Sequence, residues 1–326
     1  FQGKISSCLV NPKACFETEL TLEATAQPKN IAVVGAGPAG LSAALALDER
    51  GHRVTLIDKA GQIGGQLNLA RQVPGKEEFH GLVNWFTTLV DKSGIDLRLG
   101  AEATPETLAG FDEIVLATGV IPRDTGIEGQ DGPNVLSYIE VLSGAPVGDR
   151  VAVVGAGGIG FDVAEFLTQK GDSPTLHPEE WRAEWGVTDP ETARGGLADP
   201  KPEPAARQVT LLQRKAEKPG RRLGKTTGWI HRATLQAKGV KMIGGVNYER
   251  IDSDGLHISF GSERREPQLL VVDTVVLCAG QESLRNLAVP LTQAGKTVHI
   301  IGGADVAAEL DAKRAIDQGT RLAATM

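Results

Sequence analysis

Short apolar runs, each followed by a glycine-rich turn and then by apolar residues at helical spacing, recur along the chain. One such set spans residues 31–40 and 41–47, and a second spans residues 151–160 and 161–167. A buried strand, a tight turn and a helix in this order are typical of a βαβ unit with a parallel sheet. The repeat therefore predicts an α/β protein with two dinucleotide-binding (Rossmann-like) domains.

The rest of the pattern predicts further strands and helices. Helical spacing from Phe79 to Val90 predicts one helix, and a last helix is expected from about Asp311 to the C-terminus. Short apolar or alternating runs predict strands at residues 54–57, 97–99, 114–117, 209–212, several between 240 and 276, and one at 297–301.

The first glycine turn has the spacing that a nucleotide diphosphate needs. Gly35 permits the tight turn, Gly37 leaves no Cβ in the path of the diphosphate, and Gly40 lets the helix pack closely on the strand. Glycine spacing alone is a weak signal. Asp58, however, ends the next strand, where an acidic side chain would accept hydrogen bonds from a ribose diol.

The second glycine turn is followed by a different strand end. The strand that should correspond to the one ending in Asp58 ends in Gln213, Arg214 and Lys215. An acid at this point favours the bare ribose of NAD, whereas cations favour the 2′-phosphate of NADP. A solvated basic turn is the alternative interpretation of the two cations.

A further glycine-rich basic loop runs from Gly220 to Gly228. Its spacing does not fit a nucleoside-triphosphate loop, so that motif is rejected. Thr226 or Thr227 is expected to cap a helix that carries Trp229 to Leu235.

The domains are expected to be nested. Pro122 ends strand pairing and begins the crossing to the second domain. The last strand has no second half of its own, so the chain should return to the first domain. The predicted parts are an N-terminal arm at 1–28, a first domain at 29–121 and 281–326, and a second domain at 122–280 with a proline-rich insertion at 171–206.

The insertion contains one aromatic pair. Trp181 and Trp185 are four residues apart, which suits one face of a short helix docked on an apolar surface. Such a pair is more often packing than a ligand platform.

Composition narrows the function classes. The 326 residues are 41% apolar and 23% charged, which is ordinary for a globular protein. The net charge of −7 argues against nucleic-acid or membrane-surface binding, which usually needs a dense basic face. No apolar run reaches the length of a membrane span and no signal peptide is visible, so a cytoplasmic location is expected.

The three cysteines do not form a disulfide framework. Cys278 lies in an apolar run and is expected to be a buried thiol, whereas Cys8 and Cys15 lie in the polar arm and match no closed metal site by themselves. The chain begins with Phe, which suggests a fragment, a processed product or, at residues 1–3, an expression-tag remnant.

These features together resemble the two-dinucleotide-fold flavoprotein reductases, in which FAD occupies the first site and NAD(P)H the second. The resemblance implies hydride transfer from C4 of NADPH to N5 of FAD, with no side-chain acid or base required. It implies that FAD is bound by Gly35, Gly37, Pro38, Ala39, Gly40, Asp58, Lys59, Gly65, Gln66, Ala117, Thr118, Gly119, Gly303, Asp305 and Ala312. It implies that NADP(H) is bound by Gly155, Gly157, Gly158, Ile159, Gly160, Arg214 and Lys215.

A narrower resemblance rests on Ser7–Pro12, Pro74–Phe79, Leu223–Arg232 and Cys278–Glu282. These stretches are similar to the C-terminal portion of bacterial 2,4-dienoyl-CoA reductases, iron-sulfur flavoenzymes of fatty acid β-oxidation related to trimethylamine dehydrogenase and old yellow enzyme. In that family an N-terminal barrel holds FMN and the substrate, and four cysteines hold a [4Fe-4S] cluster. The resemblance makes Cys8 the fourth cluster ligand, with the arm a remnant of the iron-sulfur region and the barrel an intramolecular partner.

One thiolate cannot hold such a cluster, so this chain alone is not expected to reduce an enoyl thioester. It should instead act as an NADPH oxidase or diaphorase. Three alternatives remain at this point. A disulfide reductase of the thioredoxin reductase type requires a Cys-x-x-Cys pair, which the sequence lacks. A stand-alone ferredoxin-NADP reductase and a non-catalytic nucleotide-binding module are the other two.

Overall fold

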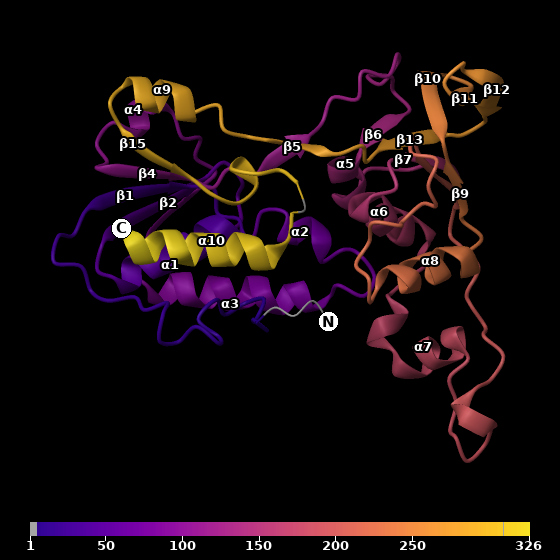
Figure 1. Cartoon of the computed structure of the whole chain (residues 1–326), viewed down its shortest axis with the longest axis horizontal. Helices are drawn as coiled ribbons and strands as arrows, with labels where there is room; N and C mark the ends of the chain where they lie inside the picture. The colour runs from indigo at the N-terminus through magenta and orange to yellow at the C-terminus, as the bar shows by residue number, and fades with distance from the viewer. Residues whose placement is uncertain (1–4, 309) are drawn as a thin grey trace. The chain divides into compact units, whose positions relative to one another are not determined.

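The computed structural model describes residues 5–308 and 310–326, so the expected tag remnant at residues 1–3 lies outside the described part (Figure 1). The chain forms two compact units. Unit 1 comprises the chain up to Arg71 together with residues 78–121 and 281–326, and unit 2 comprises residues 72–77 and 122–280. The short segment 72–77 thus belongs to unit 2 although both its neighbours in sequence belong to unit 1, which no sequence pattern indicates.

Unit 1 is built on a five-stranded parallel sheet. In spatial order its strands are β15 (Thr297–Ile300), β4 (Glu113–Leu116), β1 (Asn30–Val34), β2 (Arg53–Asp58) and β3 (Asp96–Leu99). Successive side chains of a strand point to opposite faces. Accordingly Ile31 and Val33 enter one core cluster and Ala32 and Val34 another, which is why the run of β1 is continuously apolar.

Helices cover both faces of this sheet (Figure 1). On one face lie α1 (Pro38–Glu49), α3 (Glu78–Lys92) and α10 (Ala312–Thr325), with the short α2 (Leu67–Ala70) before α3, and on the other lie α4 (Pro105–Leu108) and α9 (Ala288–Gln293). The helices α10 and α1 pack very closely. A Cβ on Gly319 of α10 would lie only 2.4 Å from the carbonyl oxygen of Ala39 in α1.

Unit 2 repeats the parallel sheet with a different second layer. Its strands follow the order β6 (Val135–Ser137), β13 (Thr274–Leu277), β7 (Arg150–Val154), β8 (Gln208–Gln213) and β9 (Lys241–Gly244). The helices are α5 (Tyr138–Leu142), α6 (Gly158–Thr168) and α8 (Gly228–Ala237), and the antiparallel strands β10 (Val246–Asp252), β11 (Gly255–Phe260) and β12 (Arg265–Leu270) cover the opposite face.

The two sheets confirm the predicted α/β class with two Rossmann-like folds. The central strands β1 and β7 each continue into a glycine turn and a helix. In its sheet β1 lies between β4 and β2, and β7 has the equivalent place between β13 and β8. Outside the sheets, β5 (Val120–Pro122) pairs with β14 (Gln281–Ser283), so strand pairing ends at Pro122 as expected.

Two local expectations in unit 2 are wrong. The insertion does form a short helix, α7 (Pro178–Trp185), but none of its residues is buried, and its two tryptophan rings pack on each other with centroids 6.3 Å apart. Contacts with an apolar surface do not hold α7 in place. A largely buried ion pair of 2.8 Å between Glu184 of α7 and Lys238 does so instead. Thr227 does precede α8, but its side chain makes no capping hydrogen bond.

Candidate functional site

The turn between β1 and α1, residues 35–40, is called the first cradle. Gly35 has φ +110°, and a Cβ there would lie 2.3 Å from the carbonyl oxygen of Ala117. A Cβ on Gly40 would lie 1.8 Å from the carbonyl oxygen of Gly35. The backbone itself therefore requires both glycines. At Gly37 a Cβ would meet nothing closer than the Gly65 Cα at 3.9 Å, so this glycine leaves open space rather than filling a tight contact.

The turn between β7 and α6, residues 155–160, is called the second cradle, and it repeats this geometry. Gly155 has φ +113°, and a Cβ there would lie 2.5 Å from the carbonyl oxygen of Cys278. A Cβ on Gly160 would lie 1.8 Å from the carbonyl oxygen of Gly155. Cβ atoms on Gly157 and Gly158 would meet no atom within 4 Å. Both cradles thus keep open space at a helix N-terminus, which is the arrangement that admits a phosphate group.

Asp58 and Gln213 occupy equivalent positions in the two sheets. The pair Val34–Ile57 in unit 1 corresponds to the pair Val154–Leu212 in unit 2, and the next residue is Asp58 in one case and Gln213 in the other. The half-buried carboxylate of Asp58 accepts the backbone N–H of Ala36 at 2.6 Å and that of Ala60 at 2.8 Å. Its remaining lone pairs stay available for further donors.

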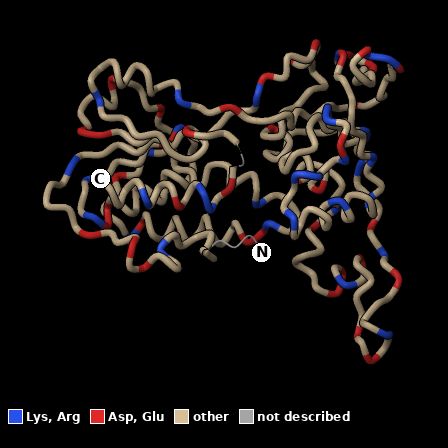
Figure 2. The backbone as a smooth tube through the Cα atoms, in the orientation of Figure 1, with Lys and Arg blue, Asp and Glu red and all other residues tan. Residues whose placement is uncertain are grey.

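The amide of Gln213 turns into its own loop. Its Nε2 donates to the carbonyl oxygen of Lys215 at 3.0 Å and to that of Glu217 at 2.5 Å. Arg214 and Lys215 are exposed, and in the part of the chain that the structure describes neither forms an ion pair. The stretch 214–225 carries one acid, Glu217, among the cations Arg214, Lys215, Lys218, Arg221, Arg222 and Lys225 (Figure 2).

Several other predicted residues surround the first cradle. The hydroxyl of Thr118 donates to the carbonyl oxygen of Leu284, and Gly119 accepts the N–H of Leu284 at 3.0 Å, so this turn holds the returning chain. A Cβ on Gly65 would lie 3.0 Å from the Cα of Gly37, which places the Gly65 loop against the cradle. Of the remaining residues, Pro38 begins α1, Ala39 is buried, Lys59 is exposed and Gln66 precedes α2. In the second cradle, Ile159 follows the first residue of α6.

The closing turn of unit 1 depends on a residue that the sequence did not reveal. Gln318 on α10 accepts the backbone N–H of Gly302 at 2.8 Å and donates to the Asp305 carboxylate at 2.9 Å. A Cβ on Gly303 would lie 2.8 Å from Cγ1 of Val120, so Gly303 is in close contact with Val120. The helix α10 then begins at Ala312, capped by the Asp311 carboxylate. The turn and the start of α10 are therefore held in a fixed arrangement.

A buried pair of titratable side chains lies behind the second cradle. Glu165 on α6 is 8% exposed and lies 2.8 Å from Nδ1 of His231 on α8. Burial raises the pKa of Glu165, and the hydrogen bond to Glu165 raises the pKa of His231. Asp162 and Lys76, themselves paired at 2.6 Å, also act on His231. The folded chain therefore holds protons at this pair more tightly than the unfolded chain does.

This pair should make the stability of unit 2 depend on pH. A raised folded-state pKa gives stability that is complete below the unfolded pKa, about 6.5 for His231, and is lost as pH rises through the folded pKa. We expect the melting temperature to fall as pH rises above about 6.5. His231→Gln should cost about 2 kcal/mol near pH 6, since it leaves a buried carboxyl without its partner.

Thermal unfolding followed by circular dichroism over this pH range provides the measurement. The double variant Glu165→Gln/His231→Gln should recover part of the lost stability and show a flatter pH dependence. An unchanged slope in the double variant would contradict the assignment.

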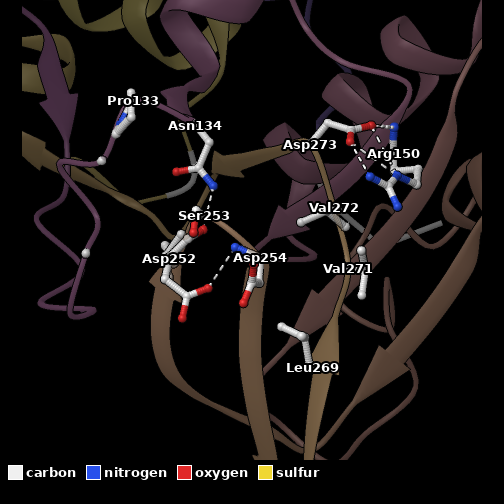
Figure 3. A pocket seen from close by; sticks show the side chains of 13 residues that line it. Pro133, Asn134, Arg150, Asp252, Ser253, Asp254, Leu269, Val271, Val272 and Asp273 are labelled. Carbon is white, nitrogen blue, oxygen red and sulfur yellow. Dashed lines mark hydrogen bonds and ion pairs between the residues drawn. The ribbon is translucent and has the colours of Figure 1, made fainter.

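A hollow of about 640 Å³ opens elsewhere in unit 2 (Figure 3). Arg150, the first residue of β7, forms a 2.5 Å ion pair with Asp273 at one side, and Asn134 donates to the carbonyl oxygen of Asp252 at 2.8 Å at another. The hollow thus lies at the amino end of β7, whereas nucleotides bind beyond the carboxyl ends of parallel strands. Since its polar groups bond to one another, the hollow does not compete with the second cradle as a nucleotide site.

The cysteines differ in environment. Burial raises the pKa of Cys278, as expected for a structural thiol. Cys8 is exposed, and the backbone N–H groups of Asn11 and Val10 lower its pKa. Among residues 5–308 and 310–326, no group of three or more His, Cys, Asp or Glu side chains is arranged to hold a metal ion. The described helices include none that is long and apolar enough to cross a membrane.

Comparison with known proteins bears directly on the two cradles. Residues 29–314, which contain both, match the model of the pyridine nucleotide-disulphide oxidoreductase family. The chain belongs to this family. It is therefore a flavoprotein oxidoreductase domain of a family that binds FAD and NAD(P)H. The open space at Gly37, Gly157 and Gly158 fits this requirement, because each point can receive a diphosphate without steric conflict.

The chain is also similar to individual proteins of known name or structure. A metal reductase of Desulforamulus reducens is 32% identical over 314 residues, covering 93% of this chain and 45% of the relative. A solved complex of 2-naphthoyl-CoA reductase with 2-naphthoyl-CoA superposes with a TM-score of 0.80 at 25% identity, covering 98% of this chain and 43% of that one. Thioredoxin reductase of T. acidophilum shares the fold, with a TM-score of 0.64 at 17% identity and coverage of 91% and 96%. The chain thus spans less than half of the first two proteins.

Proposed function

We propose that the chain transfers a hydride from NADPH to FAD, with FAD at the first cradle and NADPH at the second. The observation that carries this proposal is the pair of equivalent cradles, one followed by the acid Asp58 and the other by Gln213 and two exposed cations, Arg214 and Lys215. An acid suits the free ribose of FAD, and cations suit the 2′-phosphate of NADPH.

At the first cradle, Gly37 and the start of α1 would hold the diphosphate of FAD, and Asp58 would accept its adenosine ribose hydroxyls. Gly65 and Gln66 would border the cofactor, and Asp305, held by Gln318, would meet the ribityl and diphosphate region. The helix α10, which begins at Ala312, would direct its positive end at the pyrimidine ring of the flavin.

At the second cradle, Gly157, Gly158 and Ile159 would hold the diphosphate of NADPH, and Arg214 and Lys215 its 2′-phosphate. The cofactors supply the electron transfer, and the chain supplies position and electrostatics. Disulfide reduction is not proposed, because the sequence contains no Cys-x-x-Cys pair.

Arg214→Ala should remove the preference for NADPH. We expect KM for NADPH to rise by about 10- to 100-fold, as the loss of one charge-assisted bond to phosphate predicts, while KM for NADH stays unchanged. The measurement is the steady-state rate at which the flavin-loaded chain reduces an artificial electron acceptor, at varied concentrations of each nucleotide. Equal responses of the parent chain to NADPH and NADH, unaltered by the substitution, would remove the 2′-phosphate assignment.

We also propose that this chain corresponds to part of a longer enzyme that reduces a 2,4-dienoyl-CoA or a similar enoyl thioester. Three observations support this. The metal reductase and the 2-naphthoyl-CoA reductase are each more than twice as long as the region they share with this chain, the second of them is solved with 2-naphthoyl-CoA, and Cys8 lies exposed in the arm. In such an enzyme Cys8 would be the fourth ligand of a [4Fe-4S] cluster next to an FMN barrel.

By itself the chain should behave as an NADPH diaphorase. Steady-state assays with an artificial electron acceptor test this directly. Turnover of an enoyl-CoA by the isolated chain would contradict the proposal that reduction of the thioester requires the rest of the longer enzyme.

A further inference from the structure

We propose that Gln213 and Glu217 are positioning residues that build the 2′-phosphate site from two separate loops. The inference rests on the proposed function of the second cradle. The first loop, residues 214–218, follows β8, and the second loop, residues 220–225, leads toward α8. Neither Gln213 nor Glu217 would itself need to touch the nucleotide.

Gln213 fixes the shape of the first loop from one side. Its amide N–H groups reach two carbonyl oxygens of the loop, those of Lys215 and Glu217. A carboxylate has no donor for these carbonyls, so the acid that stands at the equivalent position in unit 1 could not hold this loop. The amide therefore does two things: it keeps negative charge away from the phosphate, and it fixes the backbone that carries Arg214 and Lys215.

The junction between β9 and β10, residues 244–245, fixes the same loop from the other side. The N–H of Gly245 donates to the carbonyl oxygen of Lys215 at 2.9 Å. A Cβ on Gly244 would lie 2.9 Å from the carbonyl oxygen of Glu217 and 3.0 Å from that of Lys215, so the two segments are in close backbone contact. The Lys215 carbonyl thus receives hydrogen bonds from both Gln213 and Gly245, which leaves this peptide little freedom to rotate.

Glu217 joins the second loop to the first. Its carboxylate lies 3.1 Å from Nε of Arg222 and 3.9 Å from Nη1 of Arg221, and its side chain is 22% exposed, against 72% and 73% for the two arginines. One anion of the first loop thus pairs with both arginines of the second loop and ties the two loops together. A phosphate monoester offers several acceptor oxygens, which suits a site built from more than one cation.

The test compares two glutamines that make the same kind of contact. Gln213→Met keeps the length of the side chain and removes its donors. Gln169→Met is the matched control, because Gln169 Nε2 donates to two backbone carbonyls at the start of the insertion, those of Lys170 and Asp172. The full chain, loaded with FAD, is assayed with NADPH and with NADH, and Arg214→Ala is measured in parallel.

We expect Gln213→Met to raise KM for NADPH by about tenfold, with kcat and KM for NADH within twofold of the parent chain. Glu217→Gln should raise KM for NADPH by about threefold, since it loosens only the second loop. Gln169→Met should change neither constant. If Arg214→Ala removes the NADPH preference and Gln213→Met does not, the positioning role is wrong and the proposed function stands. If Gln213→Met raises KM for both nucleotides equally, the role is also wrong. If the parent chain itself shows no preference for NADPH, the 2′-phosphate assignment is wrong, and the positioning role is wrong with it.

Discussion

Replacing Gly157 by alanine is expected to lower kcat/KM for NADPH by about 100-fold or more while leaving the fold and the flavin content unchanged. A Cβ at this position meets no protein atom within 4 Å, and φ is −85°, which alanine adopts freely. The added methyl group would stand only where the diphosphate approaches the amides of α6. Losing about two charge-assisted hydrogen bonds, near 3 kcal/mol, corresponds to this factor.

The measurement is stopped-flow reduction of the bound flavin at several NADPH concentrations. Gly81→Ala on α3 is the control, because a Cβ there also meets nothing within 4 Å and lies in neither cradle. A Gly157→Ala protein that is reduced as fast as the parent chain would show that no diphosphate binds at the second cradle.

Replacing Gly37 by alanine is expected to yield a protein that folds but retains little FAD. A Cβ would make only an ordinary contact of 3.9 Å with Gly65, and φ is −80°, so the backbone accepts the change. Affinity for FAD should fall by about 100-fold by the same reasoning as at Gly157. The melting temperature without added FAD should match that of the parent apoprotein, and added FAD should raise it less.

Flavin content per chain after purification, together with differential scanning fluorimetry with and without FAD, measures this effect. Gly40→Ala provides a contrast, because its Cβ would stand 1.8 Å from the Gly35 carbonyl oxygen and should destabilise even the apoprotein. A Gly37→Ala chain with full flavin content would place FAD elsewhere.

The features that sequence reasoning predicted are those with local causes. The glycines at positions 35, 40, 155 and 160 are required by contacts within a few residues or with the adjacent strand, so their spacing alone indicates the turns. The continuous apolar run of β1 reflects burial on both faces, and this also can be read from the pattern.

The features that it missed depend on side chains meeting backbone far away in sequence or in an irregular loop. Gln318 reaches Gly302 and Asp305 across the start of α10, and Gln213 reaches the carbonyls of an irregular loop. A glutamine in a sequence gives no sign of which carbonyl it will meet. The ion pair of Lys76 with Asp162, which links segment 72–77 to α6, likewise joins residues far apart in the sequence.

The expectation that Trp181 and Trp185 dock on an apolar surface is wrong for a related reason. A spacing of four residues does place Trp181 and Trp185 on one face of α7, and their rings do meet. Spacing cannot tell whether another apolar surface lies opposite. Here the rings pack on each other, Trp181 remains 39% exposed, and Glu184 provides the anchor.

The most direct test of the central claim is an anaerobic titration of the purified, FAD-loaded chain with NADPH, followed by the visible absorbance of the flavin. We predict that the chain binds FAD tightly enough to survive gel filtration, that NADPH bleaches the flavin, and that NADH does so only at higher concentration. A chain that retains no flavin, or a bound flavin that neither nucleotide reduces, would contradict the account.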